Sequence, residues 1–199
     1  MTQKKEPTPK NSAGREKTYR TQLALRQALL ELLEDQPFEQ IKVKEITTRA
    51  GVGYATFFRR YTDKDHLLSD LAANEIDKLL TMTLPLLYTV DTQASTQALC
   101  AYVWEHRQVW KVLLTGGAAA SLKEEYLRRA LELAREQPGS QAWLPEELAV
   151  TFSVTAIIEM QAWWLKQPNP LSVKEMAAII NRLAVMPVYP ATDEKAPLP

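Results

Sequence analysis

PFEQIKVKEITTRAGVGYATFFRRYTDKDHLL, residues 37–68, is the stretch that decides the fold. Val43, Ile46 and Ala50 are three and four residues apart, the spacing that places apolar side chains along one side of a helix. Gly51 follows where a tight turn needs a backbone angle that other residues resist. The stretch therefore predicts a short helix, a turn at Gly51 and a second helix over residues 53–61.

The second predicted helix separates its side chains into two sets. Phe57 and Tyr61 are four residues apart and share a buried face, so the polar side chains and the second ring point outward. Two helices joined in this way present one helix to the major groove of DNA, where hydroxyl groups and cations bind phosphates and a few side chains reach base edges. The residues predicted to bind DNA are Lys44, Thr47, Tyr54, Ala55, Thr56, Phe58, Arg59, Arg60 and Lys64.

A third helix is predicted to begin after Tyr61. Thr62 with Asp65 three residues later has the form of a capping box, which satisfies free amides at a helix start. Lys64 lies in the first turn, where the helix dipole disfavours a cation. A phosphate bound from outside relieves that effect, so Lys64 is expected to bind one.

Together these residues resemble the TetR family of bacterial transcriptional regulators over residues 20–70. The resemblance implies that Thr56, Phe58 and Lys64 hold phosphates and that Tyr54 faces bases. Three positions depart from the family's usual residues, because Phe58 stands for Tyr, Ala55 for Gly and Lys42 for the Thr that commonly caps the helix before Val43. The matching residues are Ile46, Ala50-Gly51-Val52-Gly53, Ala55-Thr56-Phe57-Phe58, Tyr61, Lys64-Asp65 and Leu67-Leu68.

Charge is distributed unevenly along the 199 residues, although the whole chain has a net charge of zero. Residues 1–66 contain 13 Lys and Arg against 9 Asp and Glu, whereas residues 67–199 contain 11 against 15. A basic front and an acidic rear are typical of a chain that meets nucleic acid at one end. The N-terminus has no apolar run that would mark a secretory signal, so we expect a cytoplasmic protein.

The periodicity predicts an all-α chain. Residues 1–16 are expected to form a flexible basic arm, 17–66 a helix-turn-helix domain, 67–186 a helical regulatory and dimerisation domain, and 187–199 a loose tail. A long helix from Lys64 to about Pro85 joins the two domains. Capping boxes are predicted at Ser121 with Glu124 and at Ser172 with Glu175.

The last two predicted helices are more apolar than one small bundle requires. One of them, residues 148–165, has only Glu159 as a charged residue, and that carboxylate near its middle argues against a membrane span. We expect a homodimer through a four-helix bundle built from two chains, as in the C-terminal helices of many TetR-family members, which residues 157–165 also resemble. The predicted interface is Val154, Ile157, Ile158, Trp163, Trp164, Met176, Ile179, Ile180 and Leu183.

A small-molecule pocket is expected in the rear domain, because large, partly polar side chains typically line such sites. The same side chains also suit an ordinary helical core. Glu159 is expected to be buried with a protein partner or a cationic ligand. The candidates are Tyr88, Tyr102, Trp104, Trp110, Tyr126, Phe152, Glu159 and Met160.

No motif for catalysis, a cofactor or a metal is present in the sequence, and the single cysteine, Cys100, excludes an intramolecular disulfide. The function hypothesis is a homodimeric transcriptional repressor that leaves a palindromic operator when a small-molecule effector binds. The alternative is a helical interaction protein whose helix-turn-helix docks a protein partner, in which case Arg59 and Arg60 form a solvated face.

Overall fold

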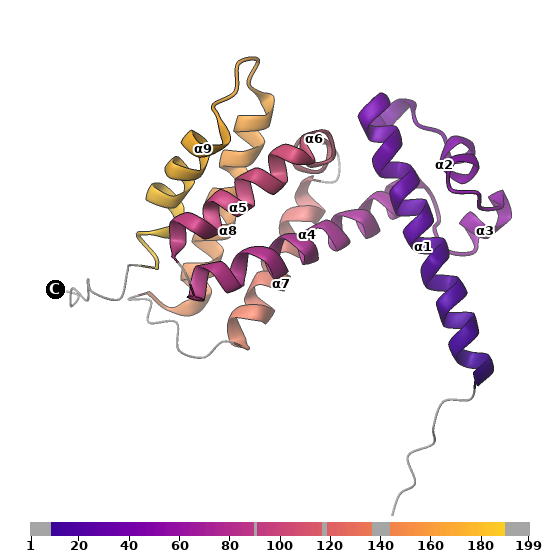
Figure 1. The fold of residues 1–199 in the computed structure, drawn as a ribbon, viewed down its shortest axis with the longest axis horizontal. Helices are drawn as coiled ribbons and strands as arrows, with labels where there is room; N and C mark the ends of the chain where they lie inside the picture. Colours follow the sequence, from indigo (N-terminus) through magenta and orange to yellow (C-terminus); the bar gives the residue numbers. More distant parts are fainter. Residues whose placement is uncertain (1–8, 90, 117–118, 137–143, 190–199) are drawn as a thin grey trace, which may run out of the picture. The chain divides into compact units, whose positions relative to one another are not determined.

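The structure, a computed structural model, describes residues 9–89, 91–116, 119–136 and 144–189. Every regular element among these residues is helical, which confirms the all-α class (Figure 1). The chain divides into two compact units, Met1–Asp70 and Leu71–Pro199. The boundary lies within α4 (Lys64–Thr89), four residues beyond the expected one.

The first unit consists of α1 (Pro9–Asp35), the 3-10 helix η1 (Phe38–Gln40), α2 (Val43–Arg49), α3 (Tyr54–Phe58) and the start of α4. The helices enclose one apolar core, because each places its apolar positions on a single side. Its fully or nearly buried members are Leu25, Leu29, Phe38, Ile41, Ile46, Phe57, Tyr61, Leu67 and Leu68.

Three helix boundaries in this part of the chain differ from expectation. The first helix begins at Pro9 and not at Lys17, since proline suits the first turn of a helix, so residues 9–16 are helical and not an arm. Helix α3 ends at Phe58, because Arg60 and Tyr61 both donate their amides to the Phe57 carbonyl in a tightened turn. Helix α4 continues through Pro85 to Thr89, so the proline lies within its last turns and does not end it.

The cap of α4 is Asp63, so the predicted capping box at Thr62 is wrong. The Asp63 carboxylate accepts the His66 amide at 2.7 Å, and this bond lowers the carboxyl pKa of Asp63. His66 returns the contact, since its Nδ1 accepts the Thr62 amide at 3.4 Å. Asp and Thr are both good caps, and the side chain one residue nearer the helix makes the bond.

The second unit contains the rest of α4 and five further helices in the described residues (Figure 1). Helix α5 packs mainly on α9, while α8 packs on α6 and α7. Trp110 and Trp164 are completely buried at the centre of this unit. The helices are α5 (Thr92–Glu105), α6 (Arg107–Thr115), α7 (Ala119–Arg135), α8 (Glu146–Lys166), α9 (Val173–Ile180) and the π-helical turn η2 (Asn181–Val185).

Two predictions at helix ends of this unit have opposite outcomes. The capping box of Ser172 with Glu175 is confirmed, with the Ser172 amide 2.9 Å from the Glu175 carboxylate. The box at Ser121 is wrong, because α7 already begins at Ala119. Residues 187–189 are also not a loose tail, since Val188 is buried against the unit.

Helix α8 is the one helix of the described ranges that is long and apolar enough to cross a membrane. Half of its most apolar window is buried inside the chain. Its contacts with α6, α7, α9 and η2 account for that composition as the central helix of a bundle.

Candidate nucleic-acid interface

The outer face of α3 carries two aromatic rings that the core does not use. Phe57 has no exposed surface, whereas Tyr54 is 56% and Phe58 46% exposed. The two exposed rings meet edge to face at 5.0 Å, and Phe58 also meets Phe57 at 5.1 Å. These contacts pair Tyr54 and Phe58 on the surface, where the sequence predicted both side chains to point outward.

The turn between α2 and α3 fixes where this face lies. Gly51 has a φ of 62°, the left-handed region that glycine adopts without steric cost. The Val52 amide then donates to the Thr47 carbonyl at 2.9 Å, which closes the turn against the end of α2. At the start of α2, the Glu45 carboxylate accepts the Lys42 amide at 2.7 Å.

Hydroxyl and guanidinium groups surround the aromatic pair. Arg59 lies exposed on the surface, and its Nη2 donates to the Thr56 hydroxyl at 2.7 Å. Ala55 and Lys44 are exposed, and Arg60 is partly exposed. The face therefore combines cations, a hydroxyl group and flat apolar rings, which are the groups that contact phosphates and base edges.

Two residues predicted for this face have other roles in the structure. Thr47 is only 4% exposed, and its hydroxyl donates to the Lys44 carbonyl at 3.0 Å. Lys64 donates to the carbonyls of Phe38, Glu39 and Ile41 at 2.8 to 3.1 Å and lies over the Phe38 ring. An ammonium has three N–H donors, so Lys64 uses all of them on the backbone around η1.

A charged cluster ties the end of the α3 region to α1 and α4. Arg26 donates to both carboxylate oxygens of Asp70 at 2.8 and 2.6 Å, and the Tyr61 hydroxyl donates to Asp70 at 2.5 Å. Burial alone would raise the pKa of the Asp70 carboxyl, but the bonds from Arg26 and Tyr61 outweigh it and lower that pKa. The cluster stabilises the position from which α3 is presented. No sequence spacing indicates it, since its members lie up to 44 residues apart.

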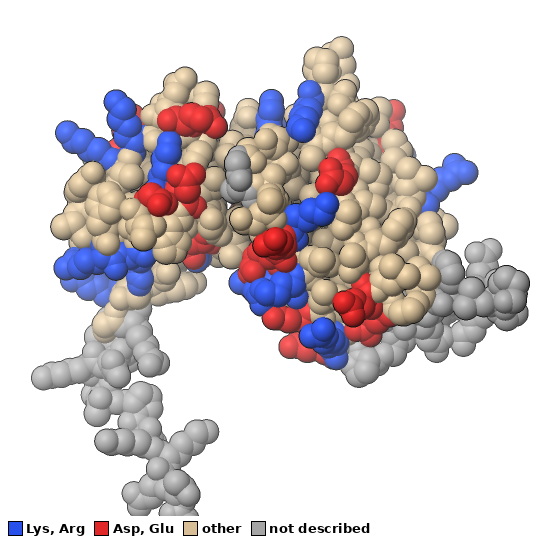
Figure 2. Space-filling view, turned by 180° about the vertical axis from the view of Figure 1, so that it is seen from behind, with Lys and Arg blue, Asp and Glu red and all other residues tan. Residues whose placement is uncertain are grey.

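Charge is also distributed differently over the two units. Figure 2 shows a band of Lys and Arg side chains along the lower edge of the unit that carries α1 to α3. Over the visible face of the other unit, Lys and Arg alternate with Asp and Glu. On this face, the first unit therefore offers the more continuous positive surface to a polyanion.

The second unit contains a cavity, but most residues predicted to bind a ligand lie elsewhere. Of the seven candidates whose side chains the structure describes, only Tyr126 lines it. Tyr102 donates to Glu75, and Trp104 stacks on Trp164. Trp110 lies in the core, and Phe152 is exposed. The Tyr88 side chain lies outside the described residues.

Glu159 and Met160 are likewise absent from the cavity wall. The expected burial of Glu159 is wrong, because its side chain is 67% exposed. The expected protein partner is present, since Lys123 donates to the Glu159 carboxylate at 3.0 Å. Sequence reasoning favoured large side chains, whereas the cavity is lined by smaller ones: Leu80, Thr83, Leu84, Ser95, Thr96, Leu99, Ala130, Ala134, Val150, Ser153, Val154, Ile157 and Val185, with Tyr126 and Tyr189.

The residues predicted for a dimer interface separate into two groups. Trp163, Ile179 and Leu183 are 38 to 58% exposed and remain candidates. The other six are buried within one chain, where they build its own core: Val154, Ile157, Ile158, Trp164, Met176 and Ile180. Sequence reasoning missed Leu148, Phe152 and Met186, which are 46 to 53% exposed. Leu148 and Phe152 are four residues apart, and Met186 follows Leu183 by three. This helical spacing is the sequence signal that would have identified them.

Comparison with known proteins relates this geometry to one family. The family described as "Bacterial regulatory proteins, tetR family" matches residues 25–71. A comparison with curated proteins finds no match.

Solved structures resemble the chain over most of its length. A TetR transcriptional regulator from Streptococcus agalactiae has 19% identity and a TM-score of 0.58, over 87% of this chain and 98% of that one. A TetR-family regulator from Syntrophomonas wolfei has 11% identity and a TM-score of 0.62, over 85% and 95%. The regulator FadR from Bacillus subtilis, solved in complex with stearoyl-CoA, has 15% identity and a TM-score of 0.60, over 83% and 98%. The chain therefore has the fold of TetR-family transcriptional regulators.

Proposed function

We propose that this chain, whose residues 25–71 match the TetR family, is a homodimeric transcriptional regulator that binds DNA through the outer face of α3. The observation that carries the proposal is the contrast between adjacent rings: Phe57 is buried in the core, while Phe58 and Tyr54 form a pair on the exposed surface. An exposed aromatic pair has no use in the core and is costly to leave in water. Contact with DNA gives it a partner.

Each side chain on this face has a role set by its chemistry. Arg59 and Arg60 contribute charge to phosphates, and the Thr56 hydroxyl donates to a phosphate oxygen. Tyr54 reaches base edges, and the Phe58 ring contacts a thymine methyl group. Lys64 holds η1 against α4 in place of the phosphate contact that its position first indicated.

Dimerisation uses the exposed apolar residues of α8 and of the α9–η2 segment. Leu148, Phe152 and Trp163 lie on one side of α8, since they are separated by four and eleven residues. Ile179, Leu183 and Met186 follow one another at four and three residues. Two such faces from two chains form a four-helix bundle. A two-fold dimer matches operator half-sites about 34–36 Å apart.

The regulator is a cytoplasmic repressor that a small molecule releases from its palindromic operator. The cavity of the second unit receives the effector. Its binding tilts α4 and changes the separation of the two recognition helices. The effector shifts this equilibrium only because it binds the released form more tightly than the DNA-bound form.

The test is selection of double-stranded DNA from a random pool by the full chain. We expect an enriched palindrome with half-sites one helical turn apart. Leu183→Glu places a carboxylate in the apolar dimer face and is expected to abolish enrichment of the palindrome. Glu136→Gln, an exposed change outside that face, is the control and keeps it. A pool without any preferred sequence would contradict the proposal.

An interaction protein is the second candidate function, favoured by the exposed Tyr54–Phe58 pair and by the engagement of Lys64 within the chain. An aromatic pair of this kind also suits a protein interface. The same selection separates the two functions, because a protein-docking surface enriches no DNA sequence while forming a stable protein complex.

A further inference from the structure

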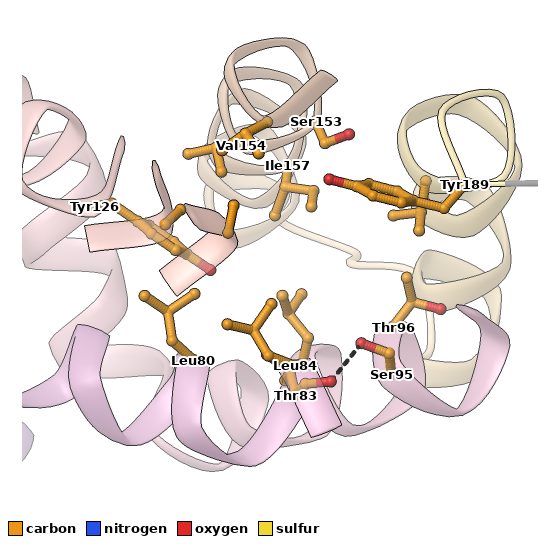
Figure 3. A pocket seen from close by; sticks show the side chains of 15 residues that line it. Leu80, Thr83, Leu84, Ser95, Thr96, Tyr126, Ser153, Val154, Ile157 and Tyr189 are labelled. Atoms are coloured by element: carbon orange, nitrogen blue, oxygen red, sulfur yellow. Dashed lines mark hydrogen bonds between the residues drawn. The ribbon is translucent and has the colours of Figure 1, made fainter. Parts of the chain in front are cut away.

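The cavity of the second unit is formed where five segments of the chain converge. Its volume is about 80 Å³. Figure 3 shows Leu80, Thr83 and Leu84 of α4 on one side, Ser153, Val154 and Ile157 of α8 on the other, and Tyr126 of α7 and Tyr189 at two ends. Ser95 and Thr96 of α5 complete the wall. The π-helical turn η2 contributes Val185 and leads the chain to Tyr189.

The wall carries hydroxyl groups but, among the residues that the structure describes, no charged side chain. An ion that entered such a cavity would lose its hydration without gaining a counter-charge, which costs several kcal/mol. The composition of the wall therefore selects for uncharged molecules.

The four Ser and Thr hydroxyls of the wall already donate their protons to the backbone. Thr83 donates to the Leu79 carbonyl at 2.8 Å, Ser95 to the Thr83 carbonyl at 2.9 Å and Ser153 to the Ala184 carbonyl at 2.8 Å. Thr96 donates to the carbonyl of Thr92 at 3.0 Å. A hydroxyl group has one proton, so these oxygens can only accept hydrogen bonds from a ligand.

Tyr126 differs from these groups. It is 3% exposed, and its hydroxyl points toward the middle of the cavity (Figure 3). Within the described ranges, no side chain or carbonyl accepts its proton. Burial raises the pKa of the Tyr126 hydroxyl, so the group keeps its proton at neutral pH. The hydroxyl oxygen itself is open to the cavity, so a ligand oxygen placed there can accept its hydrogen bond.

We propose that this cavity binds an uncharged, compact molecule whose carbonyl or hydroxyl oxygen accepts the hydrogen bond of Tyr126, with an apolar body against Leu80, Val154 and Ile157. The inference rests on the proposed function for the role of this molecule as effector. A cavity of roughly 150 Å³ binds benzene, so this smaller one limits the ligand to at most about six non-hydrogen atoms. The neutral wall excludes carboxylates and amines of the same size.

The experiment measures dissociation constants of the full chain by ligand-observed NMR for four probes of matched size. They are cyclopentanone, cyclopentane, butyrate and butylammonium. We expect cyclopentanone to bind most tightly and the two ions to bind at least about tenfold more weakly. Butyrate or butylammonium binding as tightly as cyclopentanone would overturn the proposal.

The hydrogen bond is tested with Tyr126→Phe, which removes one oxygen atom and keeps the ring. We expect the affinity for cyclopentanone to fall about fivefold and that for cyclopentane to stay unchanged. The thermal midpoint should not fall, because the hydroxyl has no partner to lose. Tyr102→Phe is the control: its hydroxyl bonds Glu75 and is absent from the cavity wall, so both affinities should be unchanged. Equal affinity of Tyr126→Phe and the parent chain for cyclopentanone would overturn the assigned donor.

Failure of the cavity proposal and of the regulatory function are distinguishable, because probe binding is measured without DNA. Probe binding that depends on Tyr126 supports the cavity chemistry whatever the DNA result. The DNA selection described above decides the regulatory function whatever the probes do.

Discussion

The two units place their aromatic and hydroxyl side chains differently: on the outer surface in the first unit and around a cavity in the second. In the first unit, Tyr54, Thr56 and Phe58 lie outside a sealed core. In the second, Tyr126 and four Ser and Thr side chains line a cavity, and the Tyr126 hydroxyl points into it. A site on one short helix follows from a local pattern of the sequence, whereas a cavity depends on which helices converge. The difference explains why the first site is the easier one to find from sequence.

The largest expected effect tests the separation of buried and exposed side chains on α3, and it compares the adjacent rings of Phe57 and Phe58. Phe57→Ala removes a ring with no exposed surface and is expected to lower the free energy of unfolding by about 3–5 kcal/mol. Phe58→Ala truncates a half-exposed ring and should cost less than about 1 kcal/mol. Denaturant titration of both variants measures the difference. Equal losses would show that α3 does not separate its faces as the structure has it.

The next largest effect concerns the cluster that holds α3 in place. Asp70→Asn breaks the ion pair with Arg26 and weakens the bond from Tyr61, with an expected loss of about 2 kcal/mol. Asp65→Asn, an exposed change on the same helix, is the matched control and should cost less than about 1 kcal/mol. The two variants are compared by urea denaturation at pH 7. Indistinguishable midpoints would show that the Arg26–Asp70–Tyr61 cluster does not stabilise the fold.

The same cluster predicts a pH dependence. The pKa of Asp70 is lower in the folded chain than in the unfolded chain, where it is about 3.9. Its contribution to stability is therefore complete above about pH 4 and is lost as the pH falls through the folded-state value. Unfolding curves of the parent chain and of Asp70→Asn should converge under acid conditions. A stability difference that stays constant down to pH 2 would contradict this assignment.

A smaller loss of stability is expected on changing Lys64, which donates to backbone carbonyls of its own chain where the sequence predicted a phosphate contact. Lys64→Met keeps the aliphatic stem over Phe38 and removes the three bonds to the backbone around η1. Because water can replace part of these bonds, the expected loss of stability is about 1 kcal/mol. Thermal unfolding measures it. An unchanged midpoint together with a large loss of DNA affinity would restore the phosphate role.

Sequence reasoning was most successful where a few neighbouring residues determine the structure. The α2–turn–α3 segment depends on the spacing around Gly51, and the start of α9 depends on the capping box at Ser172; both are local features. It was least successful where the partner lies far along the chain. Lys64 looked free for a phosphate because its carbonyl partners are 23 to 26 residues away. The sequence pattern also could not decide whether Thr62 or Asp63 caps α4, because both side chains can accept an amide hydrogen bond at a helix start.

Most of the residues that line the cavity were missed for a related physical reason. Large aromatic residues fill space, so Trp110 and Trp164 are completely buried in the core. A cavity remains where small side chains such as Ala130 and Ala134 of α7 line the space between helices. Which small residues meet depends on helix packing, and the sequence does not state it. The dimer face had the same difficulty, since apolar residues of α8 serve both the core and the surface.

The central claim is that the outer face of α3 contacts DNA phosphates. The most direct test is the dependence of DNA affinity on salt concentration for the parent chain, Arg59→Ala and the control Lys111→Ala, an exposed cation of α6. Each lost phosphate contact should reduce the slope of log affinity against log salt by about 1, so Arg59→Ala should show a shallower slope and Lys111→Ala the parent slope. A slope unchanged by Arg59→Ala, or an affinity that does not respond to salt at all, would contradict the claim.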